Sequence, residues 1–132
     1  MDFPVLICDD SHLAQRLLSK ALPEDWSCHV LFAGDGNEAL AILRTRHVAL
    51  TLIDLSMPNM DGWQLLQAIR QENIETLCLV VTGDRQLETH KRALQAGATA
   101  VFNKPVNPDK LQAILAEYGL YSADCQATEN TH

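Results

Sequence analysis

The sequence predicts an α/β fold in which five parallel strands alternate with five helices, and three observations lead to this prediction. Short apolar runs rich in Val, Leu and Ile recur along the chain, and amphipathic segments with helical spacing lie between them. Glycine, proline and small polar residues stand at the junctions. Several runs are apolar on both faces, which requires helices on both faces of the sheet. A repeated strand-helix order predicts parallel strands joined by right-handed crossovers.

The expected strands are short runs in which Val, Leu and Ile dominate and polar residues are rare. Their length and their content of branched aliphatic residues favour buried strands over short helices. In chain order they comprise residues 4–8, 28–33, 48–53, 77–82 and 100–103.

Between and after these strands, apolar residues recur at the spacing that places them on one side of a helix. The first three helices are marked by Ala14, Leu17, Leu18 and Ala21, by Ala39, Ile42 and Leu43, and by Leu65, Leu66 and Ile69. The fourth and fifth are marked by Leu87, Ala93 and Leu94, and by Leu111, Ile114, Leu115 and Tyr118.

Residues suited to helix ends stand where each helix should begin or stop. Ser11 can cap the first helix, Gly34-Asp35-Gly36 turns into the second, and Asp61-Gly62 precedes the third. Gly97 closes the fourth helix, and Asn107-Pro108 starts the fifth with proline in its first turn.

Composition limits the domain organisation and the partners. With 132 residues, of which 47% are hydrophobic, the chain fits one domain with its own core, expected at residues 1–121. The polar tail at 122–132 is expected to be disordered. A net charge of -7 and scattered Lys and Arg residues argue against direct nucleic-acid binding. The cysteines show no paired spacing, which suggests a reducing, cytoplasmic environment. No apolar stretch approaches the roughly 20 residues of a spanning helix, so no membrane association is expected.

Acidic residues follow two of the expected strands at the point where each strand ends. Asp54 follows a continuous apolar run, and Asp9-Asp10 follows another. Strand-end carboxylates at one edge of a sheet lie where ligand sites of open α/β folds occur. They would repel one another unless a cation or protonation relieved their charge, and hard oxygen ligands suit Mg²⁺. This pattern predicts a metal-assisted site that handles phosphate.

Several motifs together resemble the receiver domains of two-component response regulators, the CheY-like superfamily. Asp9-Asp10 follows the first strand, and Asp54 ends the third in Asp-Leu-Ser-Met-Pro-Asn-Met-Asp-Gly. Thr82-Gly83 ends the fourth, and Gly97-Ala98 leads to Lys104-Pro105. The resemblance covers about residues 4 to 118 and implies a flavodoxin-like fold with strand order 2-1-3-4-5.

The resemblance implies a role for each acidic residue. Asp54 would accept the phosphoryl group from a phosphohistidine on a histidine kinase or histidine phosphotransfer protein and become an aspartyl phosphate. Asp10 and Asp54 would bind Mg²⁺ directly, Asp9 through water, and Ser56 would contribute its backbone carbonyl oxygen. As an alternative role, the Asp9-Asp10 pair can cap the first helix, and both roles can hold together.

The remaining implied residues handle the phosphoryl charge. Lys104 would neutralise the developing negative charge, and Thr82 would donate its hydroxyl to a phosphoryl oxygen. The Lys104–Pro105 bond is a candidate cis peptide. The family commonly has an aromatic residue three positions before the lysine, where this chain has Val101. Because strand residues alternate between faces, Phe102 cannot simply replace it. We therefore expect switching through backbone and helix shifts, without an aromatic rotamer.

The expected function is a phosphorylation-dependent switch that binds other proteins and catalyses only its own phosphorylation and dephosphorylation. The output would pass to an unidentified protein or to a missing C-terminal effector domain. The chain is expected to be a monomer or a weak dimer through the face of the fourth helix, fifth strand and fifth helix. The alternatives are an aspartate-nucleophile phosphohydrolase and a flavodoxin-like binding protein. The first lacks an acid at Ser56, and the acidic pair after the first strand disfavours the second.

Overall fold

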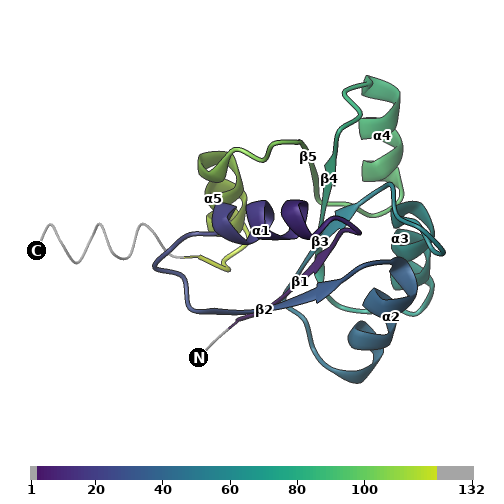
Figure 1. Cartoon of the computed structure of the whole chain (residues 1–132), viewed down its shortest axis with the longest axis horizontal. Helices are drawn as coiled ribbons and strands as arrows, with labels where there is room; N and C mark the ends of the chain where they lie inside the picture. Colours follow the sequence, from purple (N-terminus) through teal and green to yellow (C-terminus); the bar gives the residue numbers. More distant parts are fainter. Residues whose placement is uncertain (1–2, 122–132) are drawn as a thin grey trace, which may run out of the picture.

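The computed structural model describes residues 3–121, in which five strands and five helices alternate along the chain (Figure 1). The strands are β1 (Phe3–Cys8), β2 (Cys28–Ala33), β3 (Leu50–Asp54), β4 (Leu77–Thr82) and β5 (Ala100–Asn103). The helices are α1 (His12–Ala21), α2 (Gly36–Thr45), α3 (Gly62–Gln71), α4 (Leu87–Gln95) and α5 (Pro108–Glu117). The tail at 122–132, predicted to be disordered, lies outside the described residues.

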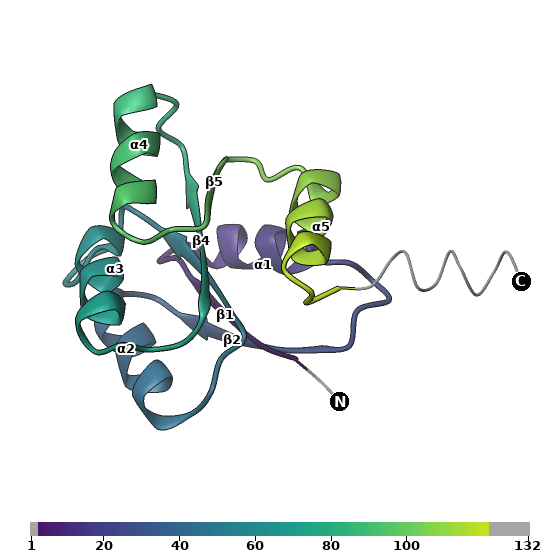
Figure 2. The ribbon, with the colours of Figure 1, turned by 180° about the vertical axis from the view of Figure 1, so that it is seen from behind.

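The strands form one parallel sheet in the order β2-β1-β3-β4-β5, which confirms the predicted fold class. α1 and α5 cover one face of this sheet, and α2, α3 and α4 cover the other (Figures 1 and 2). The strand order reverses between β1 and β3, the point at which open α/β sheets bind ligands. The topology therefore directs attention to the carboxyl ends of these two strands.

Two apolar layers make up the core, one on each face of the sheet. In β1, Leu6 and Cys8 pack with α2, α3 and α4, whereas Val5 and Ile7 pack with α1 and α5. All four side chains have no exposed surface. Alternate strand residues point to opposite faces, so a strand buried on both sides must be apolar throughout. Burial also raises the pKa of the Cys78 thiol to about 11, consistent with a cysteine that serves as a small core residue.

The structure shifts the third strand relative to its prediction. We expected residues 48–53, but β3 is Leu50–Asp54. Val48 precedes the strand but is only 1% exposed. Burial in the core, and not strand pairing, therefore explains why this position is apolar. At the other end Asp54 pairs with Val81 of β4 and is the last residue of the strand. Its backbone is therefore fixed by the sheet.

Some of the apolar positions predicted to face the core are wrong on α1, on α4 and at the end of α5. The residues concerned are large and exposed, with Leu87 at 66%. α4 packs on β5, a strand of only four residues, and buries small Ala93 among its own residues. A large aliphatic side chain is not needed for so narrow a contact, so leucines at helical spacing remain in solvent. The exposed residues are Leu17, Leu87, Leu94 and Tyr118.

Helix ends follow the predicted capping residues. Ser11 accepts a hydrogen bond from the Ala14 amide at 3.2 Å, and Asp61 forms a capping box with Gln64. Asn107 caps α5, and Gly97 follows α4 with a φ of 117°, a conformation that favours glycine. Every helix within residues 3–121 is too short or too polar to cross a bilayer.

Candidate functional site

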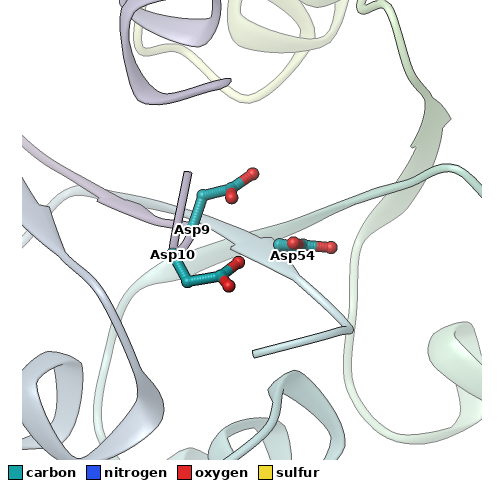
Figure 3. Close-up of side chains that lie close together, drawn as sticks. All are labelled: Asp9, Asp10 and Asp54. Atoms are coloured by element: carbon teal, nitrogen blue, oxygen red, sulfur yellow. The ribbon is translucent and has the colours of Figure 1, made fainter. Parts of the chain in front are cut away.

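Three carboxylates meet at the carboxyl edge of the sheet (Figure 3). Asp54 is the last residue of β3, and Asp9 and Asp10 directly follow β1, the neighbouring strand. One oxygen from each side chain lies within 4.8 Å of the others. Asp9 and Asp54 are buried, at 1% and 6% exposure, whereas Asp10 is exposed. The predicted acidic residues are therefore together, with two of them withdrawn from solvent.

Asp9 is held by hydrogen bonds to both its side chain and its backbone. Its Oδ1 accepts from the Ser11 amide at 2.9 Å, and its Oδ2 accepts from the Lys104 ammonium at 2.8 Å. The side-chain amide nitrogen of Gln15, Nε2, donates to the Asp9 backbone carbonyl oxygen at 2.7 Å. Gln15 is a buried polar residue of α1 that the sequence pattern does not single out. The only signal for it is a polar residue between the apolar positions Ala14 and Leu18.

Lys104 brings a positive charge from the loop after β5 into the acidic cluster. Its Nζ lies 2.8 Å from Asp9 Oδ2 and 3.4 Å from Asp54 Oδ2. Burial, followed by the negative charge of Asp9, raises the pKa of Asp54 above its ordinary value, and Lys104 partly opposes this shift. Burial lowers the pKa of Lys104, but its hydrogen bond to Asp9 and the charges of both carboxylates outweigh burial and raise it. The lysine is thus held as a cation.

The loop after β3 is held by hydrogen bonds from backbone amides and by the close approach of Gly62 to the backbone of Asp54 and Leu55. The Gly62 amide donates to the Leu55 carbonyl oxygen at 3.1 Å, and the Ser56 amide donates to Asp54 Oδ1 at 3.2 Å. A Cβ at residue 62 would collide with the Asp54 carbonyl oxygen and lie 2.7 Å from the Leu55 Cα. Only glycine fits there without displacing the backbone of Asp54. The glycine of the Asp-Gly pair therefore positions the candidate nucleophile.

Thr82 ends β4, the next strand of the sheet beyond β3. Its side chain is buried, and its Oγ1 accepts a hydrogen bond from the Asp84 amide at 3.0 Å. The Lys104 amide donates to the Thr82 carbonyl oxygen at 2.9 Å. The Lys104–Pro105 peptide bond is cis. Thr82 and Lys104 are thereby tied to each other through the backbone.

The two residues before Asn103 lie on opposite faces of the sheet. Val101 packs against the core layer of α2, α3 and α4, and Phe102 packs against the layer of α1 and α5. Both are half-buried. An aromatic ring at 102 therefore faces away from α4, as strand alternation requires. Whether switching proceeds without an aromatic rotamer stays a prediction.

The donor set suits a hard divalent cation. Within residues 3–121 the carboxylate of Asp10 has no hydrogen-bond or ion-pair partner, although it lies beside two other carboxylates. An unpaired carboxylate next to like charges favours a cation that all three can share. Carboxylate oxygens are the ligands that Mg²⁺ takes in proteins, with waters completing the shell. The residues present therefore fit a magnesium site, and the Ser56 carbonyl remains a predicted further ligand.

Comparison with protein families gives a match along most of the chain. The family model described as the response regulator receiver domain matches residues 5–116. A Rhizobium etli protein described as a probable chemotaxis protein CheY is 36% identical over 115 residues, which cover 84% of this chain and 88% of that protein. The sensor histidine kinase RcsC of Escherichia coli K12 is 35% identical over 118 residues, or 89% of this chain. The chain spans only 12% of the length of that kinase.

Solved structures agree with the family match. The receiver domain of the Francisella response regulator 1452 superposes with a TM-score of 0.77 at 30% identity, covering 92% of this chain and 98% of that one. A complex of CheX and CheY with BeF3 and Mg²⁺ from Borrelia burgdorferi gives a TM-score of 0.79 at 25% identity. It covers 88% of this chain and 89% of that chain.

Proposed function

This chain belongs to the response regulator receiver domain family, and from that premise we propose that Asp54 is its phosphoacceptor. The domain is a phosphoacceptor module of two-component signalling. One observation carries the assignment to Asp54: the buried carboxylate lies within ion-pair reach of Lys104 and within 4.8 Å of two other carboxylates. This arrangement joins a nucleophile, a cation and a set of metal-ligating oxygens at one edge of the sheet.

Asp54 attacks the phosphorus of a phosphohistidine on a partner protein. An Asp54 carboxylate oxygen forms the new P–O bond, the P–N bond breaks, and its electron pair returns to the histidine ring nitrogen. Phosphoryl transfer has a loose transition state, so positioning and charge neutralisation supply most of the catalysis. Asp54 meets the positioning requirement because β3 and the close approach of Gly62 fix its backbone.

Charge neutralisation falls to Lys104 and to a divalent cation. Lys104 moves its ammonium from the carboxylates to a phosphoryl oxygen, and the Thr82 hydroxyl donates a hydrogen bond to another. Asp9, Asp10 and Asp54, with the Ser56 carbonyl, would hold Mg²⁺. When bound, the ion neutralises charge on the phosphoryl oxygens. A relative of known structure in complex with BeF3 and Mg²⁺ supports this cofactor.

Neither alternative, the phosphohydrolase or the flavodoxin-like binding protein, gains support from the site. A phosphohydrolase of the aspartate-nucleophile type would need an acid two residues after Asp54, and Ser56 is exposed and not acidic. A flavin phosphate would meet Asp9 and Asp10 after β1, where their charge repels it. The chemistry of this domain is limited to gaining and losing its own phosphoryl group.

The partners follow from the same assignment. The donor is a histidine kinase or a histidine phosphotransfer protein, and the output is a separate protein or an effector domain beyond this chain. We assign residues 1–121 to the receiver domain. Any dimer would form weakly through α4, β5 and α5, where Leu87, Leu94 and Tyr118 are exposed.

Intact mass after incubation with acetyl phosphate tests the proposal. We expect a labile phosphoryl adduct on the wild-type chain with Mg²⁺, and none after EDTA treatment or in Asp54→Asn. Asp61→Asn is a matched control because asparagine also caps a helix, and it should still be phosphorylated. An adduct on Asp54→Asn, or acetyl phosphate turnover by the wild type without an adduct, would refute the assignment.

A further inference from the structure

Asn103 directly precedes Lys104 and contacts the turn that begins at Thr82, the last residue of β4. It is the last residue of β5 and is half-buried. Its side-chain amide nitrogen, Nδ2, donates to the Asp84 backbone carbonyl oxygen at 2.9 Å and to the Thr82 backbone carbonyl oxygen at 3.4 Å. One side chain therefore ties both ends of the Thr82-Gly83-Asp84 turn to β5.

Asp84 links this turn to the start of α4. Its amide donates to Thr82 Oγ1 at 3.0 Å. Its carboxylate accepts from the Gln86 amide at 2.9 Å and from the Thr89 hydroxyl at 2.7 Å. Gln86, the N-cap residue of α4, makes no side-chain capping bond, so the Asp84 carboxylate anchors the beginning of this helix instead.

In the proposed function, Thr82 is the part of this connection that moves. Within residues 3–121 its hydroxyl makes one hydrogen bond, as the acceptor from Asp84, so its proton is available for a phosphoryl oxygen. When the hydroxyl turns toward Asp54, it withdraws the acceptor from the Asp84 amide. Gly83 has open space around it and could absorb this change locally. Asn103 opposes that local adjustment because it holds the Asp84 carbonyl to β5.

We propose that Asn103 is a positioning residue that couples Thr82 to the start of α4. With the Asp84 carbonyl held, loss of the hydrogen bond from the Asp84 amide to Thr82 Oγ1 reorients the Gly83–Asp84 peptide and the Asp84 carboxylate, and with them the anchored turn of α4. The side chain of Val101 is too small to act as an aromatic switch, so a polar connection takes that role. This inference rests on the proposed function, since the coupling operates only when Asp54 is phosphorylated.

The chain contains a natural fluorescent reporter of the movement of α4 relative to α3. The Arg92 guanidinium of α4 lies 4.1 Å from the centroid of the Trp63 ring of α3, so a shift of α4 changes the surroundings of Trp63. The other of the two tryptophans, Trp26, packs against Phe3 with ring centroids 5.6 Å apart. Trp26→Phe therefore leaves Trp63 as the sole tryptophan.

In the Trp26→Phe parent, acetyl phosphate and Mg²⁺ are added, and two quantities are measured. Intact mass gives the phosphorylated fraction, and tryptophan emission gives the change per phosphorylated molecule. We expect Asn103→Leu, which has similar size but no donor, to be phosphorylated while its emission change falls about threefold or more. Asn37→Leu is the matched control on the exposed side of α2 and should retain the parent's change.

Separate outcomes overturn the inference and the proposed function. A full emission change per phosphorylated molecule in Asn103→Leu refutes the role of Asn103 and leaves the phosphoacceptor assignment intact. A phosphorylated parent without any emission change also refutes it, because α4 has not moved against α3. A parent that forms no adduct refutes the proposed function itself. If Asn103→Leu does not fold, Asn103→Thr serves instead, since a β-branched residue suits a strand end and cannot bridge both carbonyls, and the same loss is expected.

Discussion

Asp54 must be ionised to act as a nucleophile, and its surroundings oppose ionisation in part. Burial and the charge of Asp9 raise the pKa of Asp54, and the ammonium of Lys104 at 3.4 Å works against that rise. Any further cation shared by the carboxylates favours the ionised form. The acidic cluster and Lys104 therefore form one functional unit.

Gly62 supports that unit through the backbone. We expect Gly62→Ala to lower the free energy of unfolding by about 1–3 kcal/mol, because the new Cβ collides with the carbonyl oxygen of Asp54 and the surrounding chain must shift. Urea unfolding followed by circular dichroism measures the change.

Gly83→Ala is the control for this prediction. Nothing lies within 4 Å of a Cβ at residue 83, so its free energy of unfolding should stay within about 0.5 kcal/mol of the wild type. Equal losses in the two variants would contradict the steric explanation for Gly62.

Among the elements, α1 presents an apolar surface next to the site. A groove of about 380 Å³ runs between α1 and the segment after β5, with Leu17, Leu18, Lys104 and Pro105 among its lining residues. Leu17 is 55% exposed. Because the groove reaches Lys104, a protein that delivers a phosphohistidine to Asp54 would contact it.

We expect Leu17→Ala to slow phosphoryl transfer from a histidine-phosphorylated protein donor by about tenfold, because it removes apolar contact area at the docking surface. Phosphorylation by acetyl phosphate should not change. Leu94→Ala is the control, since Leu94 is 48% exposed on α4 and lies outside the groove. Equal slowing with the protein donor and with acetyl phosphate would count against α1 as the docking surface.

The sequence alone predicts most of the elements because their signals are local. The central strands β1, β3 and β4 are buried on both faces and must therefore be largely apolar, and Ser11 and Asp61 satisfy helix amides a few residues ahead. The acidic site was also predictable, because strand ends meet at one edge of a parallel sheet. Local patterns do not report tertiary partners. The leucines of α4 carry helical spacing but face solvent, and the buried residue of α4 is the small Ala93.

The contacts of Gln15 and Asn103 could not be predicted for the same reason. Gln15 bonds to the Asp9 carbonyl and Asn103 bonds to carbonyls of the β4–α4 turn. Each bond depends on how a helix or strand docks against its neighbour, which residue type and spacing do not encode. Polar residues inside otherwise apolar segments mark such positions only after the fold is known.

At the scale of the whole molecule, a side-chain hydrogen bond away from the site connects two segments that are far apart in the sequence. The Tyr121 hydroxyl donates to Asp25 Oδ1 at 2.7 Å and joins the segment after α5 to the loop before β2. This hydrogen bond, followed by burial and the charge of Asp25, raises the pKa of Tyr121. The protonated tyrosine is thus the form that the fold favours.

This shift predicts a loss of stability at high pH. The unfolded chain, in which tyrosine has a pKa of about 10, releases the proton first as pH rises, so the contribution of Tyr121 is complete below that pH. It then falls and is lost as pH rises through the higher pKa of the folded state. The stability advantage of wild type over Tyr121→Phe in urea unfolding should shrink across this range. A difference that is constant or grows with pH would contradict the hydrogen bond as its source.

Chemical localisation of the phosphoryl group is the decisive test that Asp54 carries it. The chain is phosphorylated with acetyl phosphate and Mg²⁺, reduced with borohydride, which converts an aspartyl phosphate to homoserine, and digested for peptide mass spectrometry. We expect homoserine at position 54 and nowhere else. Homoserine at another aspartate, or an unmodified Asp54 in a chain that carried the phosphoryl adduct, would contradict it.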